Sequence, residues 1–230
     1  MDEVYEYCVR MLGAGALAIH ASHEAFVTGG TDRIDRLAGA VQACRSRAEE
    51  AGEAGEAGAA GSGIGDGSGT LAESVAREVA DANAQLPPDQ QEALALRDLV
   101  GLSHHQIALV LQISPYAAGM LVARARLALR ARRRGVDEEP DDSCADRERA
   151  LTLMVRRQDG EPLATEDEDW LLEHLGSCDS CLRVHAAMLE ASVCYRAWRT
   201  PDPAATRPGA RRGAEDGDGE SQDVVGDAVP

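Results

Sequence analysis

The chain has 230 residues, a formal net charge of −17 and only 3% aromatic residues, and it contains no lysine. These values exclude one large aromatic core and argue against non-specific nucleic-acid binding by the whole chain, because DNA phosphates repel an acidic protein. No apolar stretch reaches membrane-spanning length, and no signal peptide is recognisable. We therefore expect a cytoplasmic protein without a membrane partner, whose six cysteines are reduced thiols or metal ligands.

Residues 1–47 have the pattern of a small domain of three short helices. Each helix has an apolar stripe at helical spacing, and glycines separate the helices. Thr31 stands where the cap of the third helix is expected. The stripe of the first helix consists of Val4, Tyr7, Cys8, Met11 and Leu12.

Three segments have the composition of linkers or tails. Residues 48–70 are Glu/Ala/Gly repeats followed by a Gly/Ser run, which predicts a flexible linker. Residues 135–143 predict a second, acidic linker, and residues 200–230 predict a disordered acidic tail.

Residues 71–134 predict a second helical domain that begins with a helix over 71–84. Pro87 and Pro88 suit the opening of the next helix, because the first helical position needs no N–H donor. Gly101 marks the end of that helix, since glycine readily adopts positive φ.

A helix-turn-helix follows within the same domain. Ser103 and Gln106 predict a capping box at the start of its first helix. A turn at 112–113 leads to Ser114, the expected cap of a long helix with Pro115 at its first position. Two helices joined by so short a turn are typical of a DNA-binding motif.

This stretch resembles region 4 of the extracytoplasmic-function sigma factors. The resemblance rests on Leu86-Pro87, the run at 99–103, Gln106-Ile107-Ala108, Ile113-Ser114-Pro115, Arg124-Ala125-Arg126 and Leu129-Arg130. It implies binding to an upstream promoter element and contact with RNA polymerase. The residues expected at the DNA are Ser114, Tyr116, Arg124, Arg126 and Arg130.

The N-terminal residues resemble the first part of sigma region 2. The resemblance rests on Val4 to Tyr7, Met11 to Gly13 and Ala18 to Phe26. It implies docking on the RNA polymerase core, with Glu24 and Phe26 as the expected contact residues.

The sharpest chemical pattern is H-x3-C-x2-C, formed by His174, Cys178 and Cys181. A Cys-x2-Cys pair directs two thiolates to one metal, and a histidine one helical turn earlier reaches the same point. A structural zinc site needs a fourth ligand. We expect Cys144 in that position, with His185 or Cys194 as alternatives.

Three helices are predicted around this pattern, in a domain over residues 144–199. The first runs from Cys144 to Gln158 and is followed by a turn at Asp159-Gly160. Thr165 is the expected cap of the second helix, and the third follows Cys178. So small a domain needs its metal for stability.

Residues 142–199 resemble the zinc-binding anti-sigma domain, through the H-x3-C-x2-C pattern, an upstream cysteine and the acidic helix before it. The resemblance implies a domain that grips a sigma factor and is in some cases redox-sensitive. Because it is fused to a sigma-like segment here, contact within the same chain is the natural expectation.

The sequence thus predicts an all-α protein of small helical domains joined by disordered linkers. The favoured function is a sigma-like regulator of transcription initiation that binds polymerase core and promoter DNA under control of a fused zinc domain. The alternative is a degenerate sigma-like or anti-sigma protein that binds another sigma or anti-sigma factor, or senses thiol oxidation, without melting a promoter. No catalytic constellation is present, so we expect no enzymatic activity.

Overall fold

The computed structural model describes residues 3–53, 71–136 and 144–198. These ranges contain ten α-helices, one π-helix and no strand, which confirms the predicted all-α fold. Most of the two predicted linkers and the predicted tail lie outside the described residues. The elements are α1 (Glu3–Leu12), α2 (Ala16–Thr28), α3 (Arg33–Glu53), α4 (Leu71–Ala84), α5 (Pro88–Leu94), η1 (Ala95–Leu99), α6 (His104–Leu111), α7 (Pro115–Arg134), α8 (Arg147–Gln158), α9 (Thr165–Ser177) and α10 (Asp179–Ala197).

The predicted caps of the helix-turn-helix are confirmed. Ser103 Oγ accepts a hydrogen bond from the Gln106 N–H at 3.2 Å, and Gln106 Oε1 accepts one from the Ser103 N–H at 3.0 Å. Ser114 Oγ accepts a hydrogen bond from the Ala117 N–H at 3.1 Å. Gly101 has a φ of +80°, as expected where a helix is stopped.

Three predicted helix boundaries are corrected. Helix α3 continues to Glu53, because the Ala/Glu sequence that was expected to be linker also favours helix. Asp32, not Thr31, caps α3, and its carboxylate accepts a hydrogen bond from the Ile34 N–H at 2.9 Å. Helix α9 begins one residue early: Ala164 is extended at the cap position, and Thr165 makes no capping hydrogen bond.

The helix that was expected to run from Pro88 to Gly101 ends in a π-helical turn, η1. A π-turn inserts an extra residue and rotates the side chains that follow. In η1, Asp98 is buried, with 6% of its surface exposed. The carboxylate of Asp98 therefore needs polar partners inside the protein.

The N-terminal segment (residues 3–53) is attached to the helix-turn-helix part of the chain through α3. Arg45 forms a bidentate pair with the buried Glu92 of α5, with distances of 2.7 and 2.6 Å. Arg33 donates a hydrogen bond to the Val100 carbonyl at 3.0 Å.

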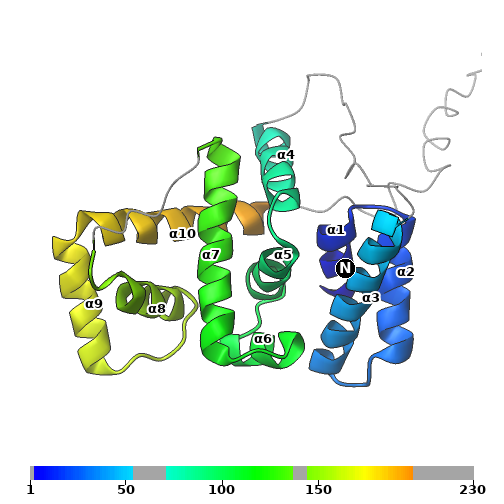
Figure 1. Cartoon of the computed structure of the whole chain (residues 1–230), viewed down its shortest axis with the longest axis horizontal. Helices are drawn as coiled ribbons and strands as arrows, with labels where there is room; N and C mark the ends of the chain where they lie inside the picture. The colour runs from blue at the N-terminus through cyan, green and yellow to red at the C-terminus, as the bar shows by residue number, and fades with distance from the viewer. Residues whose placement is uncertain (1–2, 54–70, 137–143, 199–230) are drawn as a thin grey trace, which may run out of the picture. The chain divides into compact units, whose positions relative to one another are not determined.

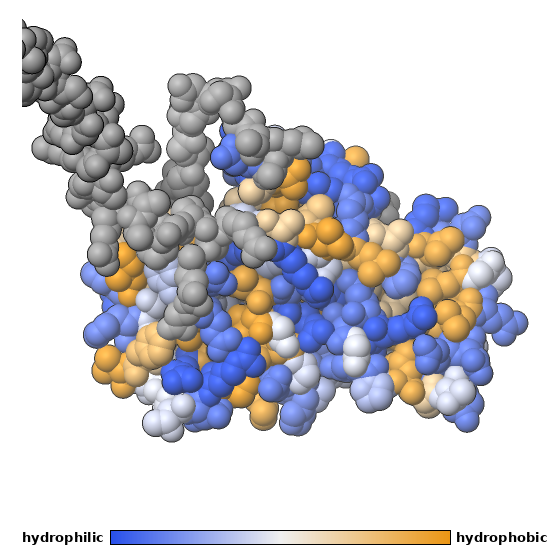
Figure 2. Space-filling model, turned by 180° about the vertical axis from the view of Figure 1, so that it is seen from behind, coloured by the Kyte–Doolittle hydropathy of each residue, from blue (hydrophilic) through white to orange (hydrophobic). Residues whose placement is uncertain are grey.

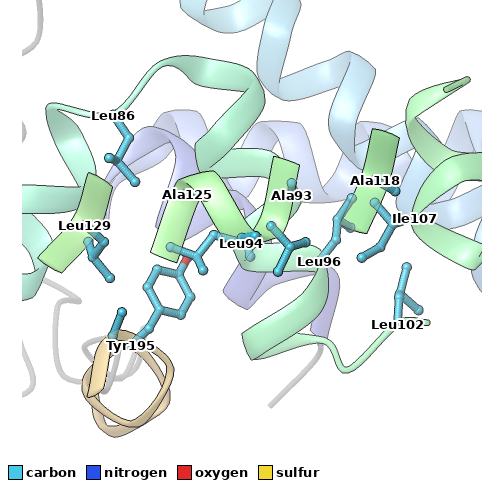
Figure 3. Packing of buried hydrophobic residues seen from close by; sticks show 14 of the residues in the cluster. Leu86, Ala93, Leu94, Leu96, Leu102, Ile107, Ala118, Ala125, Leu129 and Tyr195 are labelled. Carbon is cyan, nitrogen blue, oxygen red and sulfur yellow. The ribbon is translucent and has the colours of Figure 1, made fainter. Parts of the chain in front are cut away.

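Helix α7 packs against α4, α5 and α6, and also against α8 and α10 of the C-terminal segment (residues 144–198) (Figure 1). Figure 3 shows the ring of Tyr195, from α10, extending into the buried group that includes Ala125 and Leu94. The described residues all belong to one compact unit. The division of this unit into three folded domains stays a prediction.

Large hydrophobic residues are also exposed, and Figure 2 shows such patches (orange) among hydrophilic surface. Those on α2 and α10 are Leu17, Ile19, Phe26, Val27, Leu182, Leu189 and Val193. Among the described residues, no single helix is long and apolar enough to cross a membrane; the pair α6 and α7 passes on length and composition together, with a bend of 99°.

Candidate metal centre and nucleic-acid interface

The four predicted metal ligands come together. Cys144 precedes α8, His174 lies in the last turn of α9, Cys178 joins α9 to α10, and Cys181 lies in the first turn of α10. Their ligand atoms all lie within 4.8 Å of one another, and Cys144 Sγ is 3.5 Å from His174 Nε2. This arrangement fits one tetrahedral metal ion.

Local backbone structure brings three of these ligands to one point. The Cys178 N–H donates to the His174 carbonyl at 2.8 Å, and the Leu182 N–H donates to the Cys178 carbonyl at 3.0 Å. Cys178 therefore lies directly between two helices, with extended φ and ψ of −115° and 98°. A side chain at such a junction faces both the preceding and the following helical turn.

Aromatic stacking fixes the imidazole. The rings of Trp170 and His174 stack at a centroid distance of 4.8 Å and an angle of 14°. The guanidinium of Arg149, from α8, lies 4.0 Å from the centroid of the Trp170 ring. Such outer contacts orient a metal-ligating histidine before the metal binds.

The thiols differ in acidity. Hydrogen bonding from the Cys181 backbone stabilises the Cys178 thiolate and lowers the pKa of Cys178. Burial, together with the neighbouring Cys144 and Cys178, raises the pKa of Cys181 to about 12. Because a metal binds thiolates, a divalent cation would have to displace the Cys181 proton at neutral pH.

Cys144 completes the cluster, and the alternatives considered from sequence, His185 and Cys194, do not belong to it. Three thiols and one imidazole are a donor set that suits a structural metal site. The cluster can therefore hold a metal ion.

Helices α6 and α7 have the geometry of a helix-turn-helix. The turn between them depends on Gln112, which has a φ of 58°. Of the predicted DNA contacts, Tyr116 and Arg124 are exposed, and so is Ser114, whose hydroxyl oxygen caps α7. The Tyr116 hydroxyl donates to Glu148 of α8 at 2.8 Å. The beginning of α7 is thus partly accessible but already contacts the C-terminal segment.

Arg126 corrects the prediction. It has no exposed surface, and its guanidinium bonds Asp98 at 3.0 and 2.7 Å and Asp159 at 2.7 Å. Arg126 is therefore not available to DNA in this structure. Arg130, also predicted at the DNA, donates to Glu190 of α10 at 3.0 Å.

Asp159, which ends α8, is the centre of this buried network. His104 Nε2 lies 2.7 Å from Asp159 Oδ2, and Arg97 donates to the Asp159 carbonyl at 2.6 Å. Burial alone would raise the pKa of Asp159, but hydrogen bonds from His104 and Arg126 and the charge of Arg97 outweigh it and lower the pKa to about 2. Asp159 is therefore ionised in the folded protein.

Asp98 joins the network to α10. Its Oδ1 accepts hydrogen bonds from Ser192 at 2.8 Å and from Arg196 at 3.0 Å. One buried carboxylate thus contacts α7 and α10 together. The sequence pattern had singled out neither Asp98 nor His104, and Asp159 only as part of a turn, because partners far apart in sequence leave no local signal.

One face of the second turn of α7 packs against the protein. Ala118, Gly119 and Met120 are buried, and the Met120 sulfur lies 3.6 Å from Thr152 of α8. A Cβ added at Gly119 would lie 3.0 Å from the His104 ring. Close packing here depends on the absence of a side chain.

The expected polymerase contacts on α2 differ in exposure. Glu24 is half-buried and pairs with Arg47 of α3 at 3.0 Å. Phe26 is 47% exposed, beside the exposed Val27. Phe26 is therefore the more accessible of the two.

The comparisons with known proteins bear on the helix-turn-helix. The family model described as Sigma-70, region 4 matches residues 76–129, from within α4 to near the end of α7. Searches of curated proteins and of solved structures found no match. Residues 76–129, which contain the helix-turn-helix, are therefore similar to sigma-70 region 4, and this match supports a sigma-like role in binding DNA and polymerase.

Proposed function

We propose that the chain is a sigma-factor-like regulator of transcription initiation, which binds RNA polymerase core and promoter DNA under control of its C-terminal segment. One observation carries this proposal: α7, the second helix of a region 4 helix-turn-helix, packs against α8 and α10 of the metal-binding segment. The protein acts by binding rather than by catalysis, in the cytoplasm, where polymerase is found.

The DNA-binding part of the proposal rests on the start of α7. Tyr116 and Arg124 are exposed, and Ser114 fixes the first turn. Backbone amides at a helix N-terminus bind phosphate well. Removal of the C-terminal segment from α7 would expose Arg126 and Arg130 in addition.

The polymerase-binding part rests on α2, whose resemblance to sigma region 2 agrees with its exposed apolar residues. Ile19, Phe26 and Val27 are between 47% and 71% exposed. An isolated monomer rarely leaves such a group uncovered without a partner. We assign this face to the polymerase core, with Phe26 as the principal contact and Glu24 at its edge.

Control by the C-terminal segment is supported by its contacts with both other parts of the chain. Arg10 of α1 donates to the carbonyls of Tyr195 and Trp198, and its guanidinium lies 3.8 Å from the centroid of the Trp198 ring. The same segment holds α7 through Asp159. We propose that zinc occupies the Cys144–His174–Cys178–Cys181 cluster and keeps this segment folded, as in an anti-sigma domain.

A second function is favoured by the buried apolar residues early in α7. Ala118, Gly119 and Met120 offer no hydrogen bonds to base edges, which arginine, asparagine or glutamine normally supply. The chain would then bind another sigma factor or sense thiol oxidation without promoter melting.

Purified core polymerase, passed over the immobilised full-length protein, tests the first function. We expect retention that falls severalfold in Phe26→Ala and is unchanged in Leu182→Ala, which removes an exposed hydrophobic residue from α10 instead. Run-off transcription then tests initiation directly. If neither the native nor the metal-free protein retains core polymerase, the first function is refuted. If the protein instead forms a complex with a purified sigma factor, the second function is favoured.

A further inference from the structure

Three arginines near the C-terminal end of α7 converge on one carboxylate of α10. Arg130, Arg133 and Arg134 are spaced i, i+3 and i+4, so they lie on one side of the helix. Arg130 Nε donates to Glu190 Oε2 at 3.0 Å, and Arg134 donates to the same oxygen at 2.8 Å. Arg133 donates to Glu190 Oε1.

This arrangement has the chemistry of a phosphate site. Guanidinium groups bind carboxylate and phosphate with the same planar N–H donors, and several arginines around one anion are typical of phosphate recognition. A DNA backbone phosphate has two charged non-bridging oxygens and one negative charge, as the carboxylate of Glu190 has two oxygens and one charge. The arginines lie in the last turns of α7, directly after the residues 76–129 that match sigma-70 region 4, and this continuity favours DNA as the source of the phosphate.

We propose that Arg130, Arg133 and Arg134 form a binding site for a DNA backbone phosphate, and that Glu190 occupies it as an intramolecular substitute. The inference rests on the proposed DNA-binding role of the region 4 domain and names the contact by which that role is restrained. The same guanidinium groups cannot hold both anions, so DNA binding and docking of α10 at this point exclude each other.

Two further observations agree with competition. Glu190 is partly accessible, with 27% of its side chain exposed, and Arg134 is 50% exposed, so DNA can reach the site from solvent. Burial would raise the pKa of Glu190, but hydrogen bonds from Arg130 and Arg134 outweigh it and lower the pKa. The competitor is therefore an anion at neutral pH.

The test is fluorescence anisotropy of a labelled, non-specific DNA duplex with the full-length, metal-containing protein. Glu190→Gln keeps the size of the side chain and removes its charge. We expect it to bind DNA roughly tenfold more tightly than the native protein, as one freed charge-assisted contact allows. The slope of log affinity against log salt concentration should become steeper by the amount expected for about one additional phosphate contact.

Glu166→Gln is the matched control, because it makes the same change of net charge on the exposed first turn of α9. It should bind like the native protein. Replacing all three arginines by glutamine in the Glu190→Gln background should abolish the gain. Equal affinities of the Glu190 and Glu166 variants, or a gain that survives loss of the arginines, would overturn the proposal.

Folding is checked by circular dichroism and metal content. If Glu190→Gln fails to fold, Glu190→Asp takes its place, because the shorter side chain keeps the charge but moves the carboxylate away from the arginines. We then expect a smaller increase in DNA affinity. An unchanged DNA affinity would contradict the proposal. Core-polymerase retention separates the two claims. If core polymerase is retained but Glu190→Gln does not change DNA affinity, only the phosphate site is refuted. If Glu190→Gln binds DNA more tightly but core polymerase is not retained, only the polymerase-binding function is refuted.

Discussion

The guanidinium of Arg126 lies 2.7 Å from the carboxylate of Asp159, and neither side chain is exposed. Arg126 belongs to α7 of the region 4 domain, and Asp159 ends α8 of the C-terminal segment. If the two segments separated, Arg126 would lose Asp159 and keep Asp98 as its carboxylate partner. The pair therefore couples docking of the C-terminal segment to the buried charge of α7.

Arg126→Gln should lower the free energy of unfolding by about 3–5 kcal/mol, because it removes the one fully buried cation that Asp98 and Asp159 share and leaves them Arg196 and Arg97, which are more exposed. Urea denaturation followed by circular dichroism measures the change. Arg124→Gln, two residues away but exposed, should change stability by less than about 0.5 kcal/mol. If Arg126→Gln lowered the free energy of unfolding no more than Arg124→Gln, the buried pair would contribute little to stability.

The low pKa of Asp159 predicts a loss of stability in acid. Its folded pKa of about 2 lies below the unfolded value of 3.8, so ionised Asp159 stabilises the fold above about pH 4. This contribution, about 2 kcal/mol, is lost as pH falls from 4 towards 2. Urea midpoints at pH 5 and pH 3 should therefore differ more in the native protein than in Asp159→Asn. If the midpoint changed equally with pH in both proteins, Asp159 would not be the group that loses its stabilising charge in acid.

Gly119→Ala should destabilise the protein although alanine favours helix. The new Cβ would lie 3.0 Å from the His104 ring, and this ring is held between Asp159 and Glu161 at 2.7 and 3.1 Å. Because the contacts with these two carboxylates oppose a shift of the ring, we expect a loss of about 1–3 kcal/mol in thermal unfolding. Gly176→Ala in α9 is the control, since its Cβ meets nothing within 4 Å. That variant should gain up to about 1 kcal/mol, and the same sign in both would refute the steric argument.

Cys178→Ser should lose most of the bound metal and with it the ordered structure of the C-terminal segment, because metal binding and folding are coupled in small sites. Elemental analysis and circular dichroism measure both losses. Cys194→Ser replaces a half-buried cysteine outside the cluster and should keep its metal. Full metal content in Cys178→Ser, or an equal loss in both variants, would rule out this ligand set.

The helices and the metal cluster could be predicted from sequence because their signals are local. The Ser103 capping box needs only Gln106 three residues later, and the spacing of His174, Cys178 and Cys181 spans eight residues. Cys144 was also expected, although it lies thirty residues before His174. Cys144 begins a predicted helix of the same small domain, and the anti-sigma domain that this segment resembles has a ligand upstream of its H-x3-C-x2-C pattern.

The buried network could not be predicted in this way. Arg126 stands in an arginine-rich stretch, where its sequence neighbours Arg124 and Arg130 look equally suited to bind phosphate. Its burial depends on the π-turn that directs Asp98 inward and on Asp159, thirty-three residues away. The role of Glu190 could not be predicted either, because its arginine partners lie in a different helix far away in the sequence. Ion pairs between distant elements become visible only when the helices are packed together.

Restraint of the region 4 domain by the metal-dependent C-terminal segment is tested most directly by retention of purified core polymerase on immobilised protein, at equal loading of native and Cys178→Ser chains. We predict severalfold greater retention by Cys178→Ser, in which the segment is released, with Cys194→Ser equal to the native protein. Equal or weaker retention by a Cys178→Ser chain that has lost its metal would contradict it.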